Sequence, residues 1–102
     1  MGFMGTNEGI SANKLINLLI RAEFDRDQPG WTQRLLRDHR QAVQVCVHRL
    51  DAAKGRYNVR PNSEARDALS AARHDLVAAC AEAIRVGRMY DVDGLVSTEV
   101  RA

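Results

Sequence analysis

The chain has 102 residues, of which 45% are apolar, 5% aromatic and 27% charged. This length allows one domain with a thin core, and the composition excludes a disordered chain, a disulfide-rich scaffold and a collagen-like repeat. The net charge of +2, from 15 basic and 13 acidic residues, is too balanced to indicate a polyanion partner by itself. Two cysteines and no long apolar run predict a cytoplasmic protein with no membrane partner.

Residues 11–24 have the apolar periodicity of a short amphipathic helix. Ser11 is a suitable N-cap, because its hydroxyl can accept a hydrogen bond from a backbone N–H of the first turn. The following stretch contains Pro29 and Gly30 and is expected to break the helix.

Residues 32–54 predict a second, longer helix, with Thr32 as its N-cap and Gly55 as its stop. Apolar side chains recur along it with the heptad spacing of a helix that packs against a long antiparallel partner. The positions of this seam are Leu36, His39, Val43, Cys46, Leu50 and Ala53.

Residues 63–87 predict a third helix, which follows Pro61 and is capped by Asn62 or Ser63. The side away from its apolar seam carries Ala71, Ala78 and Ala81. Alanine there reflects either high helix propensity or a close crossing with another helix, in the same chain or in a second copy.

The predicted fold class is all-α, with a short N-terminal helix and a long antiparallel helical hairpin in one domain, 1–102. A loop of seven to nine residues is expected in the hairpin. Because the first helix is about half as long as the others, it can cover only part of their apolar surface. We expect a second copy to complete the bundle as a homodimer through Ala71, Ala78 and Ala81, with the tail 88–102 as the alternative cover.

The sequence offers no convincing catalytic, cofactor-binding or metal-binding constellation, and we expect no enzymatic activity. With the hairpin loop centred near residue 58 or 59, Cys46 and Cys80 are offset by about 13 Å along the axis, too far for a disulfide. His39 is expected near Cys80, in a structural role. The segment 91–94 has the start of a calcium loop without its remaining ligands and predicts a turn.

The basic residues are concentrated in one part of the chain. Residues 33–60 carry seven basic and two acidic side chains, a net charge of +5, whereas the segments before and after are slightly acidic. Arginine and tyrosine are frequent at the centres of interfaces. The candidate partner-binding residues are Arg34, Arg37, Gln41, Arg56, Tyr57 and Arg60.

These features predict a small non-enzymatic interaction protein that binds and regulates or inhibits a macromolecular partner, with another protein as the favoured partner. The alternative is a nucleic-acid or nucleotide-binding module that uses the same arginine-rich surface. Asp27-Gln28-Pro29 and the helix from Pro61 to Arg85 are similar in outline to small phage-encoded hairpin proteins that sequester cyclic nucleotides. That resemblance implies an inhibitor of a host or defence component, and it transfers no binding residue.

Overall fold

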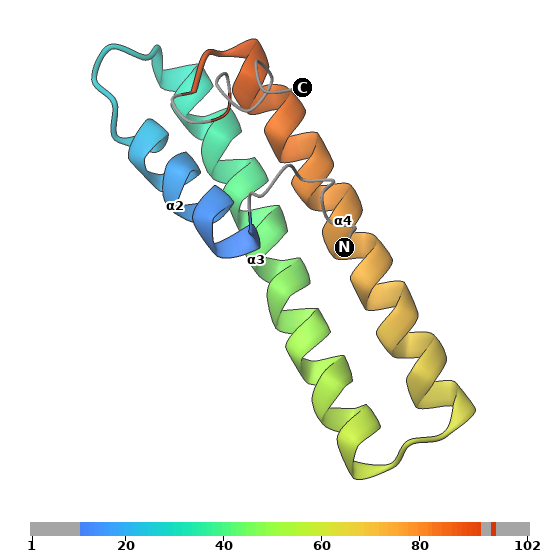
Figure 1. The fold of residues 1–102 in the computed structure, drawn as a ribbon. Coiled ribbons are helices and arrows are strands. Elements are labelled where there is room, and N and C mark those ends of the chain that lie inside the picture. The colour runs from blue at the N-terminus through green and yellow to red at the C-terminus, as the bar shows by residue number, and fades with distance from the viewer. Residues whose placement is uncertain (1–10, 93–94, 96–102) are drawn as a thin grey trace.

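The computed structural model describes residues 11–92 and 95, which form three α-helices and no strand (Figure 1). Helix α2 spans Ala12–Glu23, α3 spans Gly30–Val59 and α4 spans Ser63–Met89. Helices α3 and α4 pack against each other as an antiparallel hairpin, and α2 lies against α3. The predicted all-α class, with a short helix before a long hairpin, is confirmed.

Helix α2 forms where the sequence predicts it. The Ser11 hydroxyl oxygen accepts a hydrogen bond from the backbone N–H of Lys14 at 3.2 Å. Its buried side chains recur at helical spacing and face the hairpin; they are Leu15, Ile16, Leu18 and Leu19.

Helix α3 is longer than predicted at both ends. It begins at Gly30, where Pro29 occupies the N-cap position, so Thr32 lies buried inside the first turn and is not the cap. It also continues through Gly55 to Val59, because a glycine stops a helix only where the chain turns away, and its cost inside a helix is about 1 kcal/mol. The predicted loop of seven to nine residues is therefore wrong, since only residues 60–62 connect α3 to α4.

Helix α4 begins with the predicted cap, in which the Asn62 side-chain oxygen accepts a hydrogen bond from the Ala65 N–H at 2.8 Å. It passes the predicted end at Gly87 and reaches Met89. Gly87 is buried beneath the Leu95 side chain, so the missing side chain makes room for the chain after the helix.

The core is confined to one half of the hairpin. We call this the proximal half; it comprises α2, residues 30–48 of α3 and residues 75–89 of α4. The largest fully buried side chains all belong to it or to the chain that follows α4, and they are Leu15, Leu19, Leu36, Leu95, Val43 and Thr32. An edge-to-face contact between Trp31 and Tyr90, with ring centroids 5.4 Å apart, lies at its end.

An ion pair between Glu23 of α2 and Arg40 of α3 connects the two helices. Both Nε and Nη2 of Arg40 donate hydrogen bonds to the Glu23 carboxylate, at 2.7 and 2.8 Å. The Arg40 Nη1 group also donates to the Gln44 side chain at 2.9 Å. The side chains of Arg40 and Glu23 are only 19% and 8% exposed, and this hydrogen bonding raises the pKa of Arg40 above its ordinary value.

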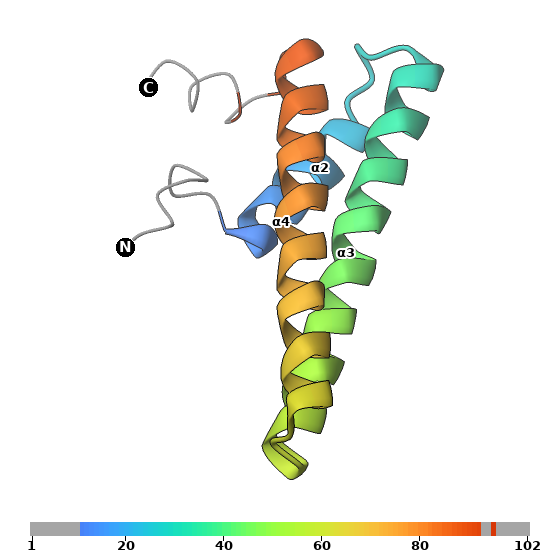
Figure 2. The same cartoon turned by 90° about the vertical axis from the view of Figure 1, so that its right-hand side faces the viewer.

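The distal half of the hairpin, residues 49–74, is two helices with no third helix of the described residues over them (Figure 2). Ala53 is its only buried side chain, and Leu50, Tyr57 and Leu69 are half-buried. As predicted, the short first helix covers only part of the hairpin. In residues 11–92 and 95, no helix has an apolar stretch long enough to cross a membrane.

Candidate interaction surface

Helix α2 covers one side of the hairpin and leaves the other side uncovered (Figures 1 and 2). Its position is fixed by the Arg40–Glu23 pair and by a hydrogen bond from the Gln33 side chain to the Asp25 carbonyl at 2.7 Å. On α4, Cys80 and Ile84 belong to the core that α2 completes. These residues define the covered side of each long helix.

The opposite side forms a surface that we call the open face. At 100° per residue, Val45 points about 140° away from Arg40 on α3, and Ala78 points about 160° away from Cys80 on α4. All of its residues are exposed. They are Asp38, Ala42, Val45, Arg49, Ala52 and Arg56 on α3, and Asp67, Ala71, Asp75, Ala78, Glu82 and Arg85 on α4.

The open face has a mixed charge pattern with an apolar component. Between residues 49 and 75, α3 contributes Arg49 and Arg56 to this face, whereas α4 contributes Asp67 and Asp75. Between these charges lie small apolar side chains, and Val45 is the largest of them, with 47% of its surface exposed. This pattern is suited to a partner that carries both signs of charge.

A charged pair on α4 lies at the proximal end of the open face. The Arg85 guanidinium donates hydrogen bonds to the Glu82 carboxylate, which lowers the pKa of Glu82 and raises the pKa of Arg85 relative to their ordinary values. Nearby His39 lowers the pKa of Glu82 a little further, consistent with His39 facing α4. Both members of the pair are exposed, so it contributes little to folding.

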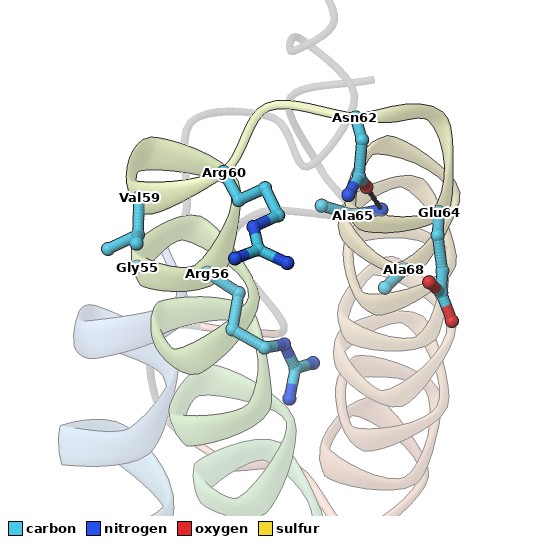
Figure 3. Close-up of a pocket in the computed structure, with 8 residues that line it drawn as sticks. All are labelled: Gly55, Arg56, Val59, Arg60, Asn62, Glu64, Ala65 and Ala68. Atoms are coloured by element: carbon cyan, nitrogen blue, oxygen red, sulfur yellow. Dashed lines mark hydrogen bonds between the residues drawn. The ribbon is translucent and has the colours of Figure 1, made fainter.

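At the distal end, the open face deepens into a cleft of about 690 Å³ between the two helices (Figure 3). Arg56 and Arg60 extend into the space between α3 and α4, and Glu64 on α4 also lines the cleft. Neither arginine forms an ion pair with another residue that the structure describes. The remaining lining is Gly55, Val59, Asn62, Ala65 and Ala68.

The six predicted partner-binding residues do not form one surface. Arg37 and Gln41 lie exposed about 100° and 60° around α3 from Arg56, towards the edge that points away from α4, whereas Arg34 is exposed in line with Ala52, at the proximal end of the open face. Arg37 pairs with its neighbour Asp38 at 3.5 Å, whereas Arg56 and Arg60 share the distal cleft. Tyr57 is half-buried on α3, because the helix continues through the residues expected to form a basic loop.

The three predicted self-association residues are all exposed on α4. Ala71 and Ala78 are seven residues apart and lie together on the open face. Ala81 is rotated by about 60° from Ala78, towards the outer edge of the helix. The sequence signal for the α3 side of the open face is the seven-residue spacing of Asp38, Val45 and Ala52. Composition alone does not reveal this signal.

The shorter loop changes the predicted register of the hairpin. With its centre at residue 61, Cys46 and Cys80 are offset by only about four residues, or 6 Å along the axis, and not by about 13 Å. Burial raises the pKa of the Cys80 thiol, and the neighbouring Cys46 raises it further. Both cysteines are free thiols, Cys80 buried and Cys46 half-buried.

Among residues 11–92 and 95, no three side chains of the metal-ligating types come together. Of the incomplete calcium-loop segment, residues 93 and 94 lie outside the described residues, as do residues 96–102 of the predicted tail. Comparison of the chain with protein-family models, curated proteins and solved structures finds no match.

Proposed function

We propose that this chain is a non-enzymatic interaction protein of the cytoplasm, which binds a protein partner through the open face of its hairpin. The carrying observation is that one entire side of α3 and α4 is exposed while combining apolar side chains with ordered charges of both signs. A solvated helix face needs no such apolar component, whereas an interface uses it to exclude water between polar contacts.

The charge pattern favours a protein over a nucleic acid. A phosphate backbone would be attracted to Arg49 and Arg56 but repelled by the carboxylates of Asp67 and Asp75 on the same face. Binding of labelled DNA and RNA at low and moderate salt tests this alternative. We expect weak binding that disappears at moderate salt, and tight binding at moderate salt would favour the nucleic-acid module.

Photo-crosslinking in the cells that produce the protein tests the function. A photoreactive benzoylphenylalanine at Val45 reports on the open face, and the same residue at the exposed Ser70, which points away from this face, is the matched control. We expect a discrete adduct from position 45 and none from position 70. Absence of an adduct from position 45, or equal labelling from both, would contradict the proposal.

Regulation or inhibition of the partner, including the phage-encoded inhibitor role, stays a prediction from sequence. The proposed surface indicates how such a role would be performed: a helical hairpin has no moving catalytic group, so it acts by occupying a surface of its partner. Variants of Val45 and Arg49 are therefore expected to lose binding and any regulatory effect together.

A further inference from the structure

We infer that the partner of the open face is a second copy of this chain, related by a two-fold axis that runs along the hairpin. The inference deepens the proposed function, on which it rests, by naming the occupant of the same face. The inference rests on how the α3 and α4 residues of the open face correspond. Residues at the same position along the hairpin axis have opposite charges or are both apolar.

The heights follow from the loop, whose middle residue is 61. Arg56 lies five residues before this point and Asp67 six residues after it, so the two are level to within about 1.5 Å. Arg49 lies twelve residues before it and Asp75 fourteen after, a difference of about 3 Å. Each arginine of α3 thus has an aspartate of α4 at its own level.

The apolar positions and the proximal charges follow the same rule. Val45 is level with Ala78, and Ala52 is level with Ala71, each to within about 1.5 Å. At the proximal end, Asp38 on α3 is level with Arg85 on α4. Here the acid is on α3 and the base on α4, the reverse of the other two charged levels, so the two charges are again opposite. Along the face, these apolar levels alternate with levels of opposite charge; Ala42, which is level with Glu82 to within about 3 Å, departs from this pattern.

A two-fold axis parallel to the hairpin would bring these corresponding residues of two copies into contact. It places α3 of one protomer against α4 of its partner, antiparallel and at unchanged height. Arg49 then meets Asp75 of the second copy and Arg56 meets Asp67, while Val45 meets Ala78. An axis across the hairpin would instead set α3 against α3, with Arg49 and Arg56 of both copies on the same side.

The small side chains at the centre also fit this arrangement. Alanine at positions 52, 71 and 78 allows two helices to approach closely, and the heptad spacing is that of helices crossing at a shallow angle. The face from residue 38 to 56 is about 27 Å long and two helices wide, an area of about 540 Å². This is at the small end of specific interfaces, so we expect a micromolar dissociation constant.

Charge reversal tests the second copy directly, with analytical ultracentrifugation as the measurement. The variant R49E/R56E presents only acidic groups at the four matched positions 49, 56, 67 and 75, and D67R/D75R presents only basic ones. Each is expected to remain monomeric at concentrations where the natural chain is dimeric, with at least about tenfold weaker association. A mixture of the two variants restores both sets of opposite charges and is expected to form a heterodimer.

The matched control, D51R/R73E, reverses two exposed charges on the side of the distal half opposite to the open face, and is expected to dimerise like the natural chain. Circular dichroism checks that every variant is helical, and recovery in the mixture cannot arise from a folding defect within either chain. A monomeric natural chain at several hundred micromolar, or variants that do not associate when mixed, would overturn the inference. A monomeric chain that still gives the Val45 adduct with another protein would keep the proposed function and overturn only the second copy.

Discussion

The proximal and distal halves of the hairpin use the same two helices but bury very different amounts of apolar surface. In the proximal half, Leu36 and Val43 are completely buried in a core to which α2 contributes leucines. In the distal half, Ala53 is the only buried side chain, and the larger Leu50 and Leu69 remain half-buried. The fold is therefore stabilised at one end, and the other end presents two helices whose sides are free for contacts.

The largest difference in stability between the two halves is expected when a leucine of α3 is replaced by alanine in each half. Leu36→Ala leaves a cavity in the proximal core and is expected to reduce the free energy of unfolding by about 3 kcal/mol. Leu50→Ala removes a side chain that already contacts solvent and is expected to cost about 1 kcal/mol. Urea unfolding measures both, and equal losses would show that the core is not concentrated at the proximal end.

A smaller effect is expected from the ion pair that fastens α2. Glu23→Gln leaves the two N–H groups that the Arg40 guanidinium donates without their carboxylate and is expected to cost about 1.5 kcal/mol. Glu82→Gln removes the acid of the exposed pair with Arg85 and is the control, with no measurable loss expected. Urea unfolding measures both losses. If Glu82→Gln reduced the free energy of unfolding as much as Glu23→Gln, the ion pair between α2 and α3 would have no special role in stability.

The smallest expected effect is a gain of stability in the distal half. A Cβ at Gly55 would meet no atom within 4 Å, so Gly55→Ala is expected to stabilise the protein by about 1 kcal/mol through helix propensity. A Cβ at Gly87 would overlap the buried Leu95 side chain, so Gly87→Ala is expected to give no gain. Thermal unfolding separates the two, and a gain at Gly87 would mean that the chain after α4 is not held against it.

The helices and their order follow from the sequence, because apolar spacing and the caps at Ser11 and Asn62 are local signals. The ends of α3 do not follow, since Gly55 and Thr32 have the residue types of a stop and a cap but lie within the helix. That error shifted the register of the hairpin by several residues, and with it the expected separation of Cys46 and Cys80.

The candidate surface was predicted only in part. Arg34, Arg56, Ala71 and Ala78 were identified by residue type and spacing, but Arg37 and Gln41 are turned towards the edge of α3 that points away from α4. Which side of the hairpin stays open depends on where α2 docks, which the Arg40–Glu23 pair fixes through residues 17 positions apart. No local pattern in the sequence contains this information.

Hydrogen exchange of the natural chain at a low micromolar and a near-millimolar concentration tests most directly whether the open face is an interface between copies. At the low concentration, we expect amides of residues 49–74 to exchange faster than those of the proximal helices, because the distal half has little core to prevent local opening. At the high concentration, pairing of the open faces is expected to slow exchange in the distal half. Exchange rates in residues 49–74 that are the same at both concentrations would contradict the account.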